Sequence, residues 1–198
     1  RVKEGMNAID VCAAPGGKTL HIAEKLNGTG HVSSRDLTYE KTALIEENKE
    51  RLGFTNVDIK AMDALTLDEK SVGVADLLIA DLPCSGLGVI GKKPDIKYKM
   101  EEGQLKDLAA LQRDILDVVT SYVKPGGTMI YSTCTINKEE NVENTRYIVE
   151  KHGFVLESLD AYLPENLHSE TTKQGYLQLL PGRHKTDGFY FARLRKPE

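Results

Sequence analysis

The stretch DVCAAPGGKT, residues Asp10–Thr19, joins two different hydrophobic patterns. An apolar run over 8–11 leads into it and is typical of a buried strand, and a helical pattern over about 19–26 follows it. Glycines let a backbone approach a ligand closely, and the start of a helix offers unpaired N–H groups. Strand, glycine turn and helix together predict the nucleotide-holding half of a doubly wound sheet.

Two ligands suit such a turn. A phosphate-binding P-loop reads G-x-x-x-x-G-K-[ST], and only its end matches the GKT at 17–19. Cys12 stands where the first glycine should be, and Pro15 removes an N–H group from the loop. S-adenosylmethionine is the other candidate, and it requires an acidic residue after the second strand, which Asp36 supplies. An ordinary strand-to-helix connection without a ligand is the third interpretation of the turn.

Length and composition indicate one globular α/β domain. The 198 residues are 40 % hydrophobic and 28 % charged, and no apolar run reaches the roughly 18 residues that a membrane span needs. The three cysteines have no C-x-x-C spacing, so they fit neither a disulfide framework nor a zinc site. We therefore expect a soluble protein of a reducing compartment, the cytoplasm, without a bound metal.

The net charge of −4 argues against a nucleic-acid-binding protein, whose surface is normally basic. Three local clusters of basic residues weaken this objection, although each is also compatible with a solvated face. The clusters are Lys92-Lys93 with Lys97 and Lys99, Arg183-His184-Lys185, and Arg193 with Arg195 and Lys196.

Strand and helix patterns alternate along the rest of the chain. We expect Thr38 to cap a helix that Gly53 ends, and Asn137 with Glu140 resembles a capping box. Another helix, over about 104–123, is closed by Pro125-Gly126-Gly127. The expected strands cover about 8–11, 30–36, 57–61, 75–81, 128–132, 154–158 and 188–194. This pattern predicts a mostly parallel seven-stranded sheet with helices on both faces and a C-terminal antiparallel hairpin.

Acidic residues and cysteines follow the expected parallel strands. Asp36 comes after the second strand, Asp63 after the third, Asp81 and Cys84 after the fourth, and Cys134 after the fifth. Ligands of doubly wound sheets bind beyond the carboxyl ends of the strands. We therefore expect these side chains to share one edge of the sheet with the glycine turn.

The two cysteines in DLPCS and STCT, Cys84 and Cys134, indicate chemistry at a ring carbon. C5 of cytosine is too weakly nucleophilic to accept a methyl group directly. A thiolate that adds to C6 makes C5 enamine-like, after which the methyl group transfers, the C5 proton leaves and the sulfur is expelled. Asp81 is placed to hydrogen-bond the ring edge, the methyl donor or both. An amino-directed methyltransferase would instead place an aromatic residue after the proline.

Each of these residues also has a purely structural interpretation. A single cysteine at a strand end is usually a small buried hydrophobe, and we prefer this interpretation for Cys12. Asp36 and Asp63 suit the ribose hydroxyls and the adenine amino group, but turns and caps use aspartate too. Cys84 alone is open to both interpretations, whereas the pair of Cys84 and Cys134 favours a catalytic role over a structural one.

The chain resembles the RNA cytosine-C5 methyltransferases, and within them the bacterial ribosomal RNA enzymes of the Sun (Fmu/RsmB-like) group. The resemblance covers nearly all 198 residues and rests on several motifs taken together. They are DVCAAPGGKT (Asp10–Thr19), DLPCSGLGVIGKKPDIK (Asp81–Lys97), YSTCTINKEEN (Tyr131–Asn141) and LLPGRHKTDGFYFARL (Leu179–Leu194). The resemblance implies a class I, Rossmann-like methyltransferase fold that uses S-adenosylmethionine.

The resemblance also implies roles for the matching residues. Asp36 holds the ribose, Asp63 holds the adenine, and Asp81 lies at the donor and the target base. Cys134 is the nucleophile and Cys84 assists release of the methylated product, an order that the chemistry alone does not decide. The donor is lined by Cys12, Ala13, Ala14, Pro15, Gly16, Gly17 and Lys18.

Two features that are usual in this family are not found in the sequence. They are a helix directly before the first strand and an N-terminal helical RNA-binding domain. We therefore expect residues 1–198 to form a single catalytic domain excised from a longer protein. We also expect a monomer that, by itself, binds the donor weakly and methylates RNA poorly.

The residues and the resemblance together predict S-adenosylmethionine-dependent methylation of cytosine C5 in RNA, with small-subunit (16S) ribosomal RNA as the substrate. The alternative is a non-catalytic RNA-binding or ribosome-assembly module that keeps the fold, although binding alone requires neither cysteine. A P-loop nucleotide hydrolase is a third candidate, which Cys12 disfavours.

Overall fold

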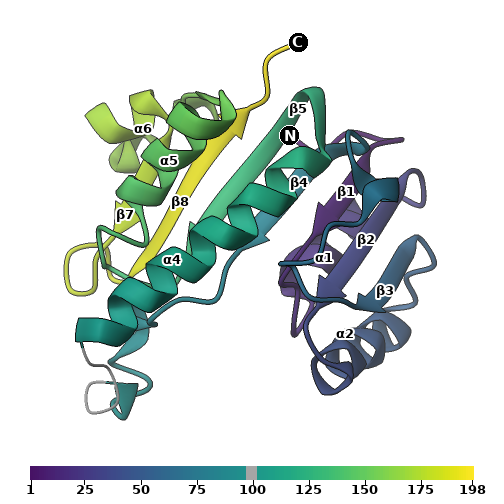
Figure 1. The fold of residues 1–198 in the computed structure, drawn as a ribbon, viewed down its shortest axis with the longest axis horizontal. Helices are drawn as coiled ribbons and strands as arrows, with labels where there is room; N and C mark the ends of the chain where they lie inside the picture. The colour runs from purple at the N-terminus through teal and green to yellow at the C-terminus, as the bar shows by residue number, and fades with distance from the viewer. Residues whose placement is uncertain (97–101) are drawn as a thin grey trace. The chain divides into compact units, whose positions relative to one another are not determined.

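A computed structural model of the chain describes residues 1–96 and 102–198 (Figure 1). Lys97 and Lys99, from the first basic cluster, lie outside the described residues. The chain divides into two compact units. The first comprises Arg1–Asp81, Val118–Met129 and Glu198, and the second comprises Leu82–Asp117 and Ile130–Pro197.

The first unit is a parallel sheet with helices packed against it. Its elements are β1 (Asn7–Asp10), α1 (Gly17–Lys25), β2 (His31–Asp36), α2 (Tyr39–Leu52), β3 (Val57–Ala61), β4 (Ala75–Asp81) and the first part of β5 (Val123–Thr133). β1 pairs in parallel with β2 on one side and β4 on the other, and β3 pairs with β2. Both α1 and α2 contact β2 and β3, as can be followed in Figure 1. The strand order therefore changes direction at β1, where doubly wound sheets bind ligands.

The strand register brings several carboxyl ends to one edge of this sheet. Asp10 of β1 is level with Ser34 of β2 and Ile79 of β4. Asp36, the last residue of β2, is level with the last residue of β3. The apolar side chains of β1 and β4 are buried on both faces, which explains why these strands read as continuous hydrophobic runs.

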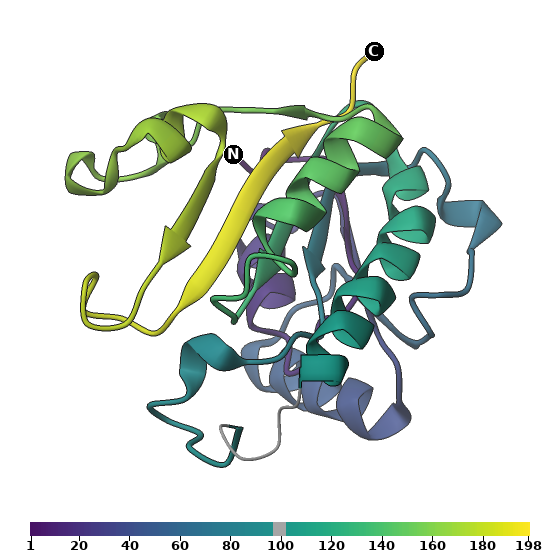
Figure 2. The same ribbon diagram turned by 60° about the vertical axis from the view of Figure 1, so that its left-hand side comes forward.

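The second unit contains antiparallel strands and the helices α4, α5 and α6. Its elements are most of α4 (Glu102–Val119), the rest of β5, α5 (Val142–His152), β6 (Val155–Leu156), α6 (Glu170–Gln174), β7 (Tyr176–Leu179) and β8 (Phe189–Arg195). β8 pairs antiparallel with both β6 and β7. Figures 1 and 2 both show α5 beside β8, where the hydroxyls of Thr145 and Tyr190 are 2.8 Å apart. The expected C-terminal antiparallel pairing is therefore confirmed.

The fold is of the predicted α/β class, but three details differ from the expectation. The described residues hold eight strands rather than seven, because the short β7 also pairs with β8. α4 ends at Val119. β5 already begins at Val123, so that residues 125–127 lie within the strand and do not end the helix. The carbonyl of Ser121 accepts a hydrogen bond from Gly73 N at 3.0 Å, which holds the end of this segment outside the helical pattern.

The capping box expected at Asn137 and Glu140 is the third difference. α5 begins at Val142, and its N-cap is Asn141, whose side chain makes no capping hydrogen bond. Glu140 is fully buried instead and bonds to the loop after β4. By contrast, Thr38 and Gly53 bound α2 as predicted, because the Thr38 hydroxyl accepts from Lys41 N and Gly53 adopts φ of 73°.

Candidate active site

The glycine turn after β1 contains a residue in the left-handed conformation. Gly16 has φ of 103°, and a Cβ atom there would lie 3.0 Å from Ile45 Cγ2 of α2. Gly17 then begins α1, and Leu20 N donates to Gly16 O at 2.9 Å. The backbone conformation and the close approach of α2 both favour glycine at position 16. The turn leaves the first amides of α1 without helical partners, as a ligand-binding turn requires.

Two of the predicted acidic residues hold this turn. Asp36 is buried at the end of β2, where its Oδ2 accepts from Ala14 N at 2.9 Å and its Oδ1 forms an ion pair with Lys41 at 3.1 Å. Asp81 ends β4, and its Oδ2 forms an ion pair with Lys18 Nζ at 2.5 Å. The structure therefore brings the loop, Asp36 and Asp81 together, as expected.

Asp63 is linked to the turn less directly. Its exposed side chain accepts from Leu65 N at 2.9 Å, which is the behaviour of a turn-forming aspartate. The preceding residue, Met62, donates its N–H to Asp36 O at 2.8 Å, and this bond places the Asp63 turn next to the end of β2. A role for Asp63 toward adenine stays a prediction.

The first residue of the DVCAAPGGKT stretch is a buried acid with an unused acceptor. Asp10 Oδ2 accepts from the Thr19 hydroxyl at 2.8 Å, whereas the buried Oδ1 has no hydrogen-bond partner. Burial raises the pKa of Asp10 to about 7. A buried polar atom without a partner is uncommon in folded proteins.

Cys12, in the same loop, behaves as a structural cysteine. Its side chain is half-buried. Burial, followed by the nearby carboxylates of Asp36 and Asp10, raises the pKa of Cys12 to about 12. The thiol therefore stays neutral at physiological pH, which supports the structural interpretation of this residue over a nucleophilic one.

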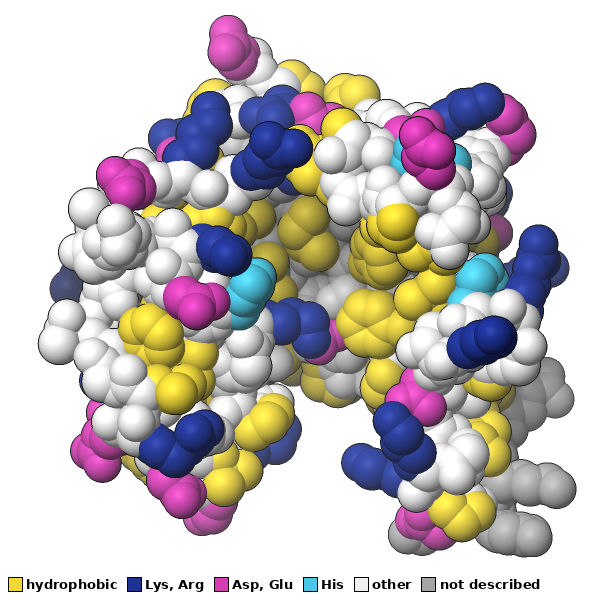
Figure 3. Space-filling model, turned by 180° about the vertical axis from the view of Figure 1, so that it is seen from behind, with side chains coloured by type: hydrophobic (Ala, Val, Ile, Leu, Met, Phe, Trp, Pro, Cys, Tyr) yellow, Lys and Arg dark blue, Asp and Glu magenta, His cyan; other side chains and the backbone are white. Residues whose placement is uncertain are grey.

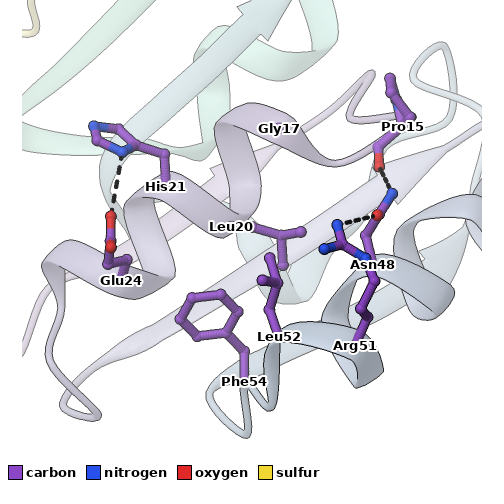
Figure 4. Close-up of a pocket in the computed structure, with 9 residues that line it drawn as sticks. All are labelled: Pro15, Gly17, Leu20, His21, Glu24, Asn48, Arg51, Leu52 and Phe54. Carbon is purple, nitrogen blue, oxygen red and sulfur yellow. Dashed lines mark hydrogen bonds and ion pairs between the residues drawn. The ribbon is translucent and has the colours of Figure 1, made fainter.

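A pocket of about 410 Å³ lies between α1 and α2 beside the turn (Figure 4). Asn48 of α2 reaches across it, and its Nδ2 donates to Pro15 O at 3.1 Å. Arg51 in turn donates to Asn48 Oδ1 at 2.8 Å. Asn48 lies outside the sequence motifs, and its bond to Pro15 holds the outer side of the glycine turn. The pocket is lined by Pro15, Gly17, Leu20, His21, Glu24, Asn48, Arg51, Leu52 and Phe54.

The other two predicted cysteines meet in the second unit. Cys84 follows β4, Cys134 follows β5, and their Sγ atoms are 3.3 Å apart. Both side chains are half-buried. The contact with Cys134 and then burial raise the pKa of the Cys84 thiol, so Cys84 is a neutral thiol at physiological pH.

Glycines bring the backbones around Cys134 together. Gly88 N donates to Cys134 O at 3.0 Å, and Gly188 N donates to Gly88 O at 2.8 Å. A Cβ atom at Gly88 would lie 2.1 Å from the carbonyl oxygen of Gly188 and 2.7 Å from that of Cys134. Position 88 therefore requires glycine, because any side chain would separate the loops that hold the two thiols.

Gln112 and Glu140 are two fully buried polar residues that the motif analysis did not assign to the site. Both bond to the loop that carries Cys84. The signal for Gln112 is its place on α4: it lies on the same helical face as Ala109, Leu116 and Val119, which are all buried. A polar residue on a buried helical face needs a hydrogen-bond partner. The apolar pattern around Gln112 could therefore have identified it from the sequence.

The basic clusters are partly engaged in ion pairs. Lys92 pairs with Asp187 at 2.6 Å, and both Arg193 and Arg195 pair with Glu157. On the face drawn in Figure 3, basic side chains are interspersed with acidic ones. The described surface on this side therefore carries mixed charge.

None of the helices within 1–96 and 102–198 is long and apolar enough to cross a membrane. In the same part of the chain, no group of three or more His, Cys, Asp or Glu side chains is arranged to hold a metal ion.

Comparison with known sequences gives matches along almost the whole chain. The profile of the family described as 16S rRNA methyltransferase RsmB/F matches residues 1–195. The probable ribosomal RNA small subunit methyltransferase B of Bacillus subtilis is 41 % identical over 197 residues, which are 98 % of this chain and 44 % of the relative. Ribosomal RNA small subunit methyltransferase F of Cronobacter sakazakii is 34 % identical over 95 % of this chain and 39 % of the relative. The chain thus spans about two fifths of the length of these relatives.

Two solved structures share the fold closely. The crystal structure of PH0851 aligns with a TM-score of 0.88 and 34 % identity, over 98 % of this chain and 43 % of that one. The crystal structure of NSun6 from Pyrococcus horikoshii with SFG aligns with a TM-score of 0.85 and 32 % identity, over 98 % of this chain and 48 % of that one. The expected methyltransferase fold is confirmed by these neighbours.

Proposed function

The chain belongs to the RsmB/F family of 16S rRNA methyltransferases, and from this premise we propose that it methylates C5 of a cytosine in small-subunit ribosomal RNA. The observation that supports C5 as the target is the contact of Cys84 Sγ with Cys134 Sγ at 3.3 Å. Methylation of a ring carbon requires a nucleophile that adds to C6 and leaves again. Methylation of an amino group requires no thiol at all.

S-adenosylmethionine is the proposed donor, and the residues of the first unit fit it. The turn at Gly16 leaves the amides of the α1 N-terminus without helical partners, and the carboxylates of Asp36 and Asp81 lie beside the loop. A donor with an amino acid part and a ribose needs this set of amides and carboxylates. When bound, S-adenosylmethionine supplies an electrophilic methyl group.

The thiols perform the covalent part of the proposed reaction. Cys134 Sγ adds to C6 as a thiolate, and the electrons of the C5–C6 double bond move to C5, which becomes the nucleophile. After methylation the C5 proton passes to solvent, the double bond re-forms and the Cys134 Sγ–C6 bond breaks with its electron pair on sulfur. Cys84, a neutral thiol beside that sulfur, donates a hydrogen bond to it as it leaves.

Asp81 has a proposed role that joins donor and base. It ends β4, pairs with Lys18 of the donor loop, and precedes Cys84 by three residues. A carboxylate at this position can accept from the exocyclic amino group of cytosine, which distinguishes cytosine from uracil. We place this activity in the cytoplasm, where a reducing environment keeps both thiols free.

Nucleoside analysis tests the proposed reaction. The purified protein is incubated with S-adenosylmethionine and a 16S ribosomal RNA transcript, and the digested RNA is examined by mass spectrometry. The proposal predicts 5-methylcytidine. Methylation at N4 of cytosine, or at another base, would show that the thiols serve a different purpose.

A further inference from the structure

Glu140 is a fully buried carboxylate whose two oxygens accept four hydrogen bonds. Oε2 accepts from Ser85 N at 2.8 Å, and Oε1 accepts from the Ser85 hydroxyl at 2.6 Å. Gln112 Nε2 donates to Oε2 at 3.1 Å, and Asn137 Nδ2 donates to Oε1 at 3.0 Å. Two of the four bonds therefore come from Ser85, the residue that follows Cys84.

Gln112 holds the other side of Cys84. Its Nε2, which donates to Glu140, also donates to the carbonyl of Pro83 at 2.8 Å. Its Oε1 accepts from Asn144 Nδ2 of α5 at 2.7 Å, which fixes the orientation of the amide. The two residues that flank Cys84 in the chain are thus bonded to one connected pair of buried side chains.

Burying a carboxylate is costly, and none of the four groups bonded to Glu140 carries a charge. A glutamine or an apolar residue would fill the same space at a smaller desolvation cost. Only a carboxylate accepts on both oxygens, whereas a glutamine would turn an NH₂ group either toward Ser85 N and Gln112 or toward the Ser85 hydroxyl and Asn137. We therefore expect that the network lowers the folding stability and fixes the backbone at residues 83–85.

We propose that Glu140 and Gln112 are positioning residues that place Cys84 Sγ against Cys134 Sγ for release of the methylated base. This inference rests on the proposed function and assigns neither residue a contact with the substrate. The thiol contact of 3.3 Å joins two loops, and the Cys84 loop is held on both sides by the pair. Displacement of Cys84 should slow the breaking of the Cys134 Sγ–C6 bond without affecting its formation.

The test follows the covalent adduct between protein and RNA on denaturing gels. With ordinary RNA and S-adenosylmethionine, wild type should show little adduct, because release follows methylation. Glu140→Gln should accumulate adduct, with a release rate lowered roughly ten- to a hundredfold, since small misplacements of reacting groups cost this much. The matched control is Glu139→Gln, which makes the same chemical change at the neighbouring exposed position and should behave as wild type.

A second variant and a second RNA distinguish failure of this inference from failure of the proposed function. Gln112→Met keeps the carboxylate of Glu140 but removes the amide that bonds Pro83, Glu140 and Asn144, so it should accumulate adduct even where Glu140→Gln folds poorly. RNA that contains 5-fluorocytosine blocks release in every variant, and all of them should form the trapped adduct as fast as wild type. Equal release in both variants and wild type would overturn the inference and leave the proposed function intact. Absence of trapped adduct in wild type, at donor and RNA concentrations high enough to saturate weak binding, would overturn the proposed function itself.

Discussion

Asp10 makes the free energy of unfolding depend on pH. Its pKa rises from the ordinary 3.8 to about 7 because the side chain is buried. The folded state therefore binds this proton more tightly than the unfolded state, and stability is lost as the pH rises from about 4 to about 7. The loss remains at higher pH, where the carboxylate is ionised in both states.

The variant Asp10→Asn measures this contribution. Asparagine keeps an oxygen for the Thr19 hydroxyl and removes the charge. Between pH 5 and pH 8, the unfolding free energy of wild type should fall by roughly 2–3 kcal/mol relative to that of the variant. Urea unfolding at several pH values provides the comparison. Parallel pH profiles for the two proteins would contradict the assignment.

Asn48 offers a second test at the level of single residues. Asn48→Ala removes the hydrogen bond to Pro15 O, and we expect donor affinity to fall roughly fivefold, as the loss of one hydrogen bond suggests. Glu47→Ala, on the exposed side of the same helix, is the matched control. Titration calorimetry measures the affinity of both variants for S-adenosylmethionine. Equal affinities would contradict a role of the Asn48–Pro15 bond in donor binding.

Motif spacing predicted the positions of the candidate site residues better than those of the residues that support them. Asp36, Asp81, Cys84 and Cys134 were predictable, because each follows a strand whose carboxyl end lies at the ligand-binding edge. Glu140 was assigned to a helix cap instead. Its Ser85 partner is 55 residues away, and no local pattern reports such a contact.

Elements with clear boundary residues were predicted closely. Thr38 and Gly53 define α2, and the apolar run of β4 was found with its bounds. The elements that differed depend on tertiary pairing: β7 has only four residues and pairs with β8, and the start of β5 lies in a glycine-containing stretch. Local sequence does not determine such pairing.

A substitution at Gly88 tests how closely the loops that hold the thiols approach each other. Gly88→Ala forces a methyl group against the carbonyl oxygens of Gly188 and Cys134, and we expect a loss of about 3 kcal/mol in the unfolding free energy. Trapping on 5-fluorocytosine RNA should also slow, because Cys134 moves. Gly91→Ala is the control, since a Cβ atom there meets nothing within 4 Å. Similar thermal stability of the two variants would contradict the close approach.

For the molecule as a whole, the proposed donor-binding residues and the proposed reacting thiols belong to different parts of the chain. The donor loop, Asp36 and Asp81 lie in the first unit, and both thiols lie in the second. Cys84→Ala and Cys134→Ala should therefore bind S-adenosylmethionine within about twofold of wild type, since both substitutions lie outside the proposed donor-binding residues. Calorimetry on the two variants tests this separation, and a large loss of affinity in either one would refute it.

The central claim is that Cys134 forms the covalent bond to cytosine and Cys84 assists its release. Trapping with 5-fluorocytosine RNA and S-adenosylmethionine tests it most directly, because fluorine at C5 cannot leave as a proton does. The account predicts a stable adduct with wild type and with Cys84→Ala, and none with Cys134→Ala. An adduct that requires Cys84 and forms without Cys134 would contradict it and reverse the roles of the two thiols.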